Sequence, residues 1–144
     1  MNQKELNEIL ELHKKWLNND GGKRADFTDA NLTGVRLADA NLSHADLTDA
    51  ILTDADLTYA NLTGANLSNC IGNSKNIKTL FIFDEYNISY TKDSLQIGCQ
   101  NHRIENWFGF NDNRILEMDG KKALKFWRKN KENIRSIIKN NPAD

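Results

Sequence analysis

Residues 25–69 read ADFTD ANLTG VRLAD ANLSH ADLTD AILTD ADLTY ANLTG ANLSN, nine consecutive units of five residues. The first position is Ala in every unit except the one that opens with Val35, and the third is Leu in every unit except the one with Phe27. A period of five fits neither an α-helix nor a β-strand. Because positions one and three point the same way along extended backbone, Ala and Leu share one side. The pattern predicts a coil with Ala and Leu inside and Asp, Asn, Thr and Ser outside, whose turns stack on one another.

This pattern resembles the A(D/N)LXX motif of the pentapeptide-repeat family. The resemblance implies a right-handed, four-sided (quadrilateral) β-helix with about twenty residues per coil. Nine units then give about two coils, and a height of only about 11 Å at the usual spacing of stacked strands. We expect all nine third-position residues to be buried, in a mainly β fold with flanking helices.

The composition divides the chain into three regions: 1–24, 25–70 and 71–144. In residues 3–18 the apolar side chains have helical spacing, which predicts an N-terminal helix. An open end of a solenoid needs a cover, so we expect this helix to cap the first coil, against Phe27, Leu32 and Leu37.

Residues 71–144 break the repeat and predict a small α+β module. Strand-forming stretches occupy 77–83, 86–91 and 94–99, and the short loops between them indicate an antiparallel meander. Helices are expected at about 102–108, 112–118 and 120–140, with Asp119 as the N-cap of the last.

Two motifs in this module carry a second resemblance. They are Y-T-x-D-x-L-Q-I-G-C-Q-x-H-x-I-E-x-W, from Tyr90 to Trp107, and M-D-G-K-K-A-L-x-F-W, from Met118 to Trp127. The layout is similar to the C-terminal region of small pentapeptide-repeat proteins of bacteriophages and prophages. The resemblance implies that origin, but it brings no activity that transfers residue by residue.

The net charge of −1 conceals a segregation of charge. Residues 25–70 carry one Arg and seven Asp, whereas residues 71–144 carry thirteen Lys and Arg against nine Asp and Glu. No window approaches the length of an apolar membrane span, and the N-terminus lacks the pattern of a secretory signal. With two cysteines and no disulfide framework, the sequence predicts a cytoplasmic protein without membrane contact and with both cysteines reduced.

The twenty-residue coil places acidic residues on one side of the stack. Asp26 lies over Asp46, and Asp29 over Asp49, while Ile51 and Tyr59 are apolar groups at outward positions. These six residues form the candidate interaction surface. The alternative is that Asp and Asn only complete the turns of the backbone.

A second, weaker candidate site lies in the C-terminal module, at Tyr90, Cys99, His102 and Trp107. Cys99 and His102 have the chemistry of a nucleophile and base, or of two metal ligands, but no further ligand pattern accompanies them. A strand-to-helix corner buried by Trp107 explains both residues without chemistry. We therefore predict no catalytic residue, no metal and no cofactor.

Binding to nucleic acid is not favoured either. The helix at 120–140 carries eight cations, but they are spread over its exposed faces as on a solvated helix. Members of the family that inhibit gyrase are thought to mimic duplex DNA with a long acidic rod, and a stack of about 11 Å spans only a fraction of one DNA turn.

Together these features predict a non-enzymatic binding protein, a phage or prophage inhibitor of a host or defence-system protein that acts through protein–protein contacts. The alternative is a sponge or sensor for a small anionic or nucleotide-like ligand in the C-terminal module. A DNA mimic acting on a topoisomerase, and an enzyme using Cys99 and His102, rank below these.

We also expect a homodimer. The far end of the stack needs a cover, and the C-terminal module is rich in large apolar groups that a module of its size does not bury completely. The predicted interface draws on the strands at 77–99 and the helix at 120–140.

Overall fold

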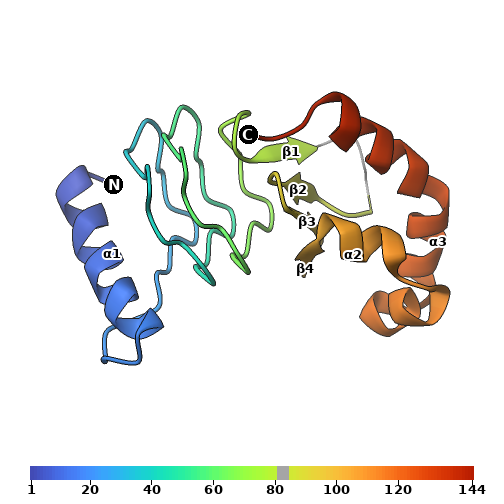
Figure 1. The fold of residues 1–144 in the computed structure, drawn as a ribbon, viewed down its shortest axis with the longest axis horizontal. Coiled ribbons are helices and arrows are strands. Elements are labelled where there is room, and N and C mark those ends of the chain that lie inside the picture. Colours follow the sequence, from blue (N-terminus) through green and yellow to red (C-terminus); the bar gives the residue numbers. More distant parts are fainter. Residues whose placement is uncertain (81–84) are drawn as a thin grey trace.

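The computed structural model describes residues 1–80 and 85–144. The regular elements, in chain order, are α1 (Gln3–Leu17), β1 (Lys78–Leu80), β2 (Ile88–Tyr90), β3 (Ser94–Ile97), β4 (Gln100–Arg103), α2 (Ile104–Gly109) and α3 (Asp112–Asn140). Between α1 and β1 the chain winds as a coil. Figure 1 shows α1 at one end of the molecule, the coiled segment beside it, and the sheet with α2 and α3 at the other end.

The coiled segment is stacked like a β-helix. Parallel bridges join residues twenty positions apart, as in the column Asp26, Asp46 and Asn66. The N–H of a third-position residue donates to the carbonyl nineteen residues further on, for example from Phe27 to Asp46 at 2.7 Å. All nine third-position residues are buried, which confirms the predicted register. We call this segment, residues 25–71, the stack.

The fifth position of every unit has a left-handed backbone. Its φ lies between 56° and 68° in all nine units. Asp, Asn, His and Gly tolerate this region better than other residues do, and they fill eight of the nine positions. Tyr59 is the exception, with φ of 58° and a side chain that is 83% exposed.

Helix α1 covers the first coil, as predicted. It begins with a capping box between Asn2 and Glu5, and Leu6 is buried in one apolar cluster with Phe27, Leu32 and Leu37. The side chain of Gln3 bonds both the N–H and the C=O of Arg36. These two bonds occupy backbone groups of the first coil that no earlier coil can reach.

The C-terminal module contains an antiparallel sheet in the order β1-β2-β3-β4. This confirms the meander, although the strands are shorter than expected and residues 81–83 of the first lie outside the described residues. The helix expected from 102 was wrong at its start, because Gln100–Arg103 forms β4. Gly98, with φ of 57°, turns the chain so that β4 pairs with β3.

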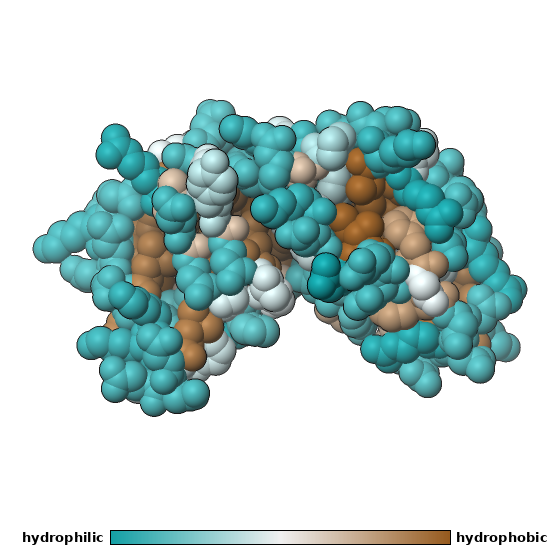
Figure 2. All heavy atoms as spheres, viewed as in Figure 1, coloured by the Kyte–Doolittle hydropathy of each residue, from teal (hydrophilic) through white to brown (hydrophobic). Residues whose placement is uncertain are grey.

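The two helices expected at 112–118 and 120–140 are both present, as the two parts of the continuous element α3. Its N-cap is Asn111, whose side chain accepts the N–H of Arg114. Asp119 and Gly120 depart from helical backbone angles and kink the helix at the predicted boundary. The apolar faces of the sheet, α2 and α3 meet in a second core. Figure 2 shows apolar residues gathered between the sheet and these helices, and also between α1 and the stack.

His13 fastens α1 to the stack by two hydrogen bonds. The N–H of Ala25 donates to Nδ1 at 3.1 Å, so Nε2 carries the proton and donates to the carbonyl of Ser43 at 3.1 Å. This pairing requires the neutral ring. Burial lowers the pKa of His13 below its usual 6.5, and Arg24 and His44 act in the same direction.

We therefore expect stability to fall when His13 gains a proton. The unfolded chain binds that proton at higher pH than the folded chain does, so the free energy of unfolding decreases as pH falls below 6.5 toward the lowered pKa. Denaturant titrations between about pH 7.5 and pH 5 measure this slope. His13→Gln is expected to flatten it. A second histidine with a lowered pKa, His102, contributes separately, and His102→Gln is the matched control for its share.

Candidate functional site

One polar residue from each strand forms a row across the sheet. Thr79 pairs with Ser89, Ser89 with Gln96, and Gln96 with Asn101. Side chains alternate between the two faces of a strand, so this row lies on the face opposite the apolar residues that pack on the helices. We call these four residues the polar row.

The polar row binds the backbone of the last coil. The amide oxygen of Gln96 accepts the N–H of Leu67 at 2.6 Å, and the amide nitrogen of Asn101 donates to the carbonyl of Ala65 at 2.6 Å. Ser89 donates to the carbonyl of Leu67 at 3.3 Å, and Thr79 to that of Cys70 at 3.0 Å. Side chains of the sheet thus replace the backbone of a further coil.

The neighbouring side of the last coil has no such cover from the described residues. Five backbone groups here occupy the positions through which the preceding coil bonds to this one. They are the N–H groups of Leu57, Tyr59, Leu62 and Gly64 and the C=O of Ala60. One coil earlier, Leu37 donates to Asp56 at 2.8 Å and Leu42 to Asn61 at 2.8 Å. Among the described residues, none of the five groups has a hydrogen-bond partner. We call them the open edge.

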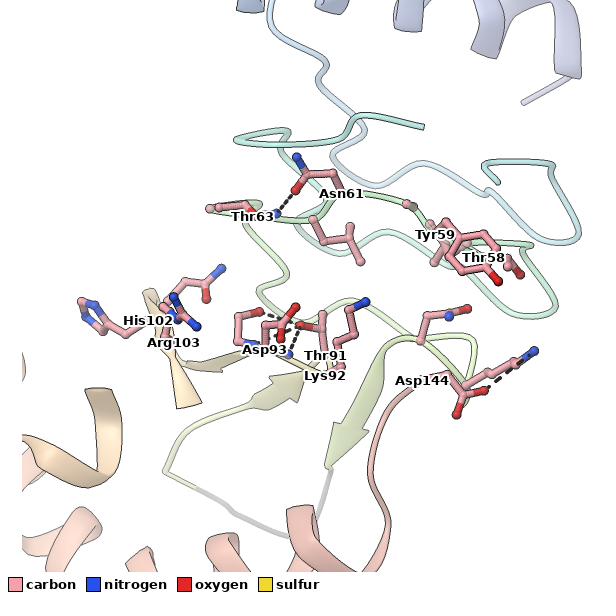
Figure 3. Close-up of a pocket in the computed structure, with 18 residues that line it drawn as sticks. Thr58, Tyr59, Asn61, Thr63, Thr91, Lys92, Asp93, His102, Arg103 and Asp144 are labelled. Carbon is pink, nitrogen blue, oxygen red and sulfur yellow. Dashed lines mark hydrogen bonds and ion pairs between the residues drawn. The ribbon is translucent and has the colours of Figure 1, made fainter. Parts of the chain in front are cut away.

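The open edge forms one wall of a cleft of about 860 Å³, which we call the stack-end cleft. The opposite wall comes from the turn between β2 and β3, residues 91–93, from Ser94 at the start of β3, and from β4. In Figure 3, Tyr59, Asn61 and Thr63 lie on the stack side, across from Thr91 and Asp93. Thr91 and Ser94 bond each other's side chains and backbone, so this turn is held by its own contacts.

The charges around the cleft nearly balance. Lys75 pairs with Asp144 at 3.8 Å at one end. At the other end Arg103 pairs with Glu105 at 3.2 Å. Between them stand Lys92 and Asp93, one charge of each sign. The cleft therefore offers backbone hydrogen bonds and apolar surface, and it has no strong preference for an acidic or a basic ligand.

The predicted acidic residues lie where the register places them, and turn chemistry accounts for them. Asp26 and Asp46 each accept the N–H and hydroxyl of the Thr two residues on, and the Thr28 hydroxyl lowers the pKa of Asp26. Asp29 and Asp49 occupy the left-handed fifth position. Arg24 pairs with Asp46 at 3.4 Å.

The two apolar members of the predicted surface have different surroundings. Ile51 is half-buried and bridges to Asn31 and Ile71 in its column. Tyr59 lines the stack-end cleft. Of the six predicted residues, Tyr59 is the one that the described structure places at the cleft.

The predicted C-terminal site is divided. The hydroxyl of Tyr90 donates to the carbonyl of Asn141 at 2.6 Å, and the indole N–H of Trp107 donates to the carbonyl of Leu95 at 2.6 Å. His102 packs edge-on against Trp107, and burial followed by Arg114 lowers its pKa. Its Nε2 bonds Gln100 at 3.2 Å.

Cys99 is a free, exposed cysteine that lines a different cavity from His102. Nothing in the described residues joins the two side chains as a nucleophile and base. Cys70 is also free but buried, which raises the pKa of its thiol. Within the described ranges no group of three or more His, Cys, Asp or Glu is arranged to hold a metal ion.

Sequence reasoning missed the polar row and the open edge. The signal for the row was present, because Ser89 and Gln96 stand between apolar residues in strands that read I-S-Y and L-Q-I. Such alternation is typical of a sheet with one solvated face. Here that face meets the end of the stack.

The comparison with protein families agrees with the repeat. The model described as "Pentapeptide repeats (8 copies)" matches residues 36–71. This segment therefore belongs to the pentapeptide-repeat family. No curated protein and no solved structure matches the chain. None of the helices in residues 1–80 and 85–144 combines the length and apolar character needed to cross a membrane.

Amide hydrogen exchange tests the open edge directly. We expect the amides of Leu57 and Leu62 to exchange at least about 100-fold faster than those of Leu37 and Leu42, which donate to the next coil. Leu67 is the internal control, since Gln96 accepts its N–H. Equal protection of Leu57 and Leu67 would show that the edge is covered.

Proposed function

We propose that this protein acts by binding another protein, and that the stack-end cleft receives an extended segment of that partner. The open edge carries the proposal. An extended peptide that adds to an exposed strand edge gains its affinity from main-chain hydrogen bonds, and five backbone groups along residues 57–64 have no hydrogen-bond partner among the described residues.

The stack itself supplies the geometry of such a complex. Its coils pair in parallel, residue on residue, so a bound segment that runs in the same direction repeats bonds that already exist one coil below. Each such bond contributes about 1 kcal/mol net. The bound segment would lie above Leu57 and Leu62. Its own small apolar side chains would there extend the columns of buried side chains inside the stack.

The cleft also favours one class of segment. Its rim charges nearly cancel, which supports an uncharged segment of small apolar and hydroxyl residues. Tyr59 is a side chain that we expect to contact the partner. A bulky residue in a left-handed turn costs free energy, and exposed aromatic rings of this kind are enriched at interfaces.

The detailed shape of the stack and the boundaries of the three regions are also proposals. We infer a right-handed, four-sided β-helix of about two coils, a boundary to the cap near residue 24, and a boundary to the C-terminal module near residue 70. The bridges twenty residues apart support this shape.

We further propose that binding blocks a host or defence-system protein in the cytoplasm. The resemblance to phage and prophage proteins supports a phage or prophage origin, although it supplies no activity. A protein that acts by occupying a surface needs no reaction centre. DNA mimicry is not part of the proposal, because the acidic residues are engaged in turns and the stack is short.

Peptide selection on the purified protein tests the proposed segment. We expect random peptides of about ten residues to yield binders that slow amide exchange at Leu57 and Leu62. Tyr59→Asn, which suits the left-handed turn, is expected to weaken them about tenfold without loss of stability. Lys92→Glu tests the rim, and Lys4→Glu on α1 is the matched charge reversal away from the cleft. Binders that leave exchange at the open edge unchanged would contradict the proposal.

The proposed homodimer through the strands at 77–99 and the helix at 120–140 is a separate prediction. Two-fold dimers are the commonest symmetric assembly. Among the described residues, however, the exposed large apolar side chains are Met1 and residues of α1 and the stack. The described aromatic residues of the C-terminal module pack in its core or lie half-buried at its edge. Light scattering at micromolar concentration is expected to give about twice 16.4 kDa. A mass of one chain would end the dimer hypothesis and leave the cleft proposal standing.

A further inference from the structure

The end of the stack that faces the C-terminal module is rich in hydrogen-bond donors. In each unit of residues 25–49, the N–H groups of the third and fifth positions donate to the next coil, whereas the carbonyl of the first position accepts from it. Leu42 donates to Asn61 at 2.8 Å in this way, and Ala40 accepts from Asn61 at 2.9 Å. The stack is therefore polar along its axis, and its last coil presents two donors for each acceptor.

The first coil has the opposite polarity, because its carbonyls face away from the next coil. Asn31 accepts from the ammonium group of Met1 at 3.0 Å, and Arg36 accepts from the side-chain amide of Gln3 at 3.1 Å. The end that presents acceptors thus binds a positively charged amino terminus. By the same reasoning, backbone N–H groups that face one way suit a negatively charged group at the other end.

The polarity also decides what the open edge can bind. Its five groups are four N–H groups and one C=O. Two copies of the chain that met through their open edges would therefore place donors opposite donors. The occupant has to present carbonyl or carboxylate oxygens instead.

A segment that runs with the last coil reaches an end at Gly64. Beyond this residue, the carbonyl of Ala65 already accepts from the side chain of Asn101 at 2.6 Å, so β4 takes the next position. Gly64 is exposed, and its exposed surface is backbone because it has no side chain. One coil earlier, the N–H of His44 donates to the carbonyl of Thr63 at 2.9 Å. The equivalent N–H of Gly64 thus stands where a bound segment has to end or turn away.

A cation lies at the same end of the cleft. Arg103 lines the cleft, and its ion-pair partner Glu105 is not among the lining residues. Both side chains of this pair are about two-thirds exposed, and such a pair contributes little, so the guanidinium group can turn toward a ligand. In Figure 3, Arg103 lies toward Thr63, whereas Asp144 lies toward Tyr59.

We propose that the open edge binds the carboxyl-terminal end of the partner protein, with the terminal carboxylate accepting the N–H of Gly64 and facing Arg103. The residues before this terminus would accept the N–H groups of Leu57, Tyr59 and Leu62 through their main-chain carbonyls. Capture of a terminal carboxylate by backbone N–H groups is an established mode of peptide recognition. This inference rests on the proposed function, because it names the part of the partner that enters the cleft.

A peptide with the sequence of residues 60–68, ANLTGANLS, is the probe, because its units match those of the stack. In register with the last coil, its final residue stands over Gly64 as Thr63 stands over His44. The peptide is acetylated at its amino end and made in three forms. They are the free acid, the amide, and a free acid extended by Gly-Ser-Gly.

The free acid is expected to bind the full chain with a Kd of about 1 mM or lower. We expect the amide and the extended form to bind about tenfold more weakly, because hydrogen bonds to a charged acceptor are stronger. Titrations followed by NMR measure the three affinities. The free acid is also expected to move the N–H resonance of Gly64 downfield in a saturable way.

Two matched variants test the cation. Arg103→Gln keeps most of the side chain and removes its charge, so the free acid is expected to bind about threefold more weakly while the amide is unchanged. Arg135→Gln is the control, since Arg135 is a partly exposed residue of α3 that also pairs with a glutamate, and it is expected to change neither. Thermal melts verify that both variants fold.

Three results would overturn this inference. Equal affinities of the acid and the amide, with Gly64 responding to both, would exclude the terminal carboxylate and support the open edge as the binding site. Binding of the free acid without a response at Gly64 would place the carboxylate elsewhere. Absence of binding by all three forms would also overturn it, whereas the peptide selection described above decides the proposed function separately.

Discussion

Every coil of the stack depends on hydrogen bonds to the coil beside it. The backbone N–H of Phe27 reaches Asp46, and that of Asp46 returns to Ala25, so no coil completes its own bonds. Buried backbone groups left unpaired are costly, and a stack this short has two unpaired ends for few interior bonds. The two flanking modules supply partners to both ends, except along the open edge.

The two ends are closed by different means. At the first coil, Gln3 takes both backbone groups of Arg36, the N-terminal ammonium group of Met1 donates to Asn31, and His13 bridges Ala25 and Ser43. At the last coil, the polar row supplies amides and hydroxyls from a sheet. In both places side chains take the part of the backbone of a further coil.

The sequence predicted the stack well because its signal repeats nine times, and a Leu at every fifth position leaves no other register. The C-terminal module was predicted less well. A helix and β4 compete for residues 102–103, and pairing with β3 across Gly98 decides the outcome. The cleft could not be predicted, because it depends on which side of the last coil the sheet covers.

The geometry of the sheet explains why the described residues leave one side of the last coil uncovered. Four strands spaced about 4.8 Å apart place their four polar side chains along about 14 Å, whereas the last coil presents twenty residues of edge. The row therefore reaches Ala65 to Cys70, and Asn73 satisfies the carbonyl of Ala55. Residues 57–64 lie between these two contacts, beyond the reach of either. The open edge follows from fitting a flat sheet to the end of a coil.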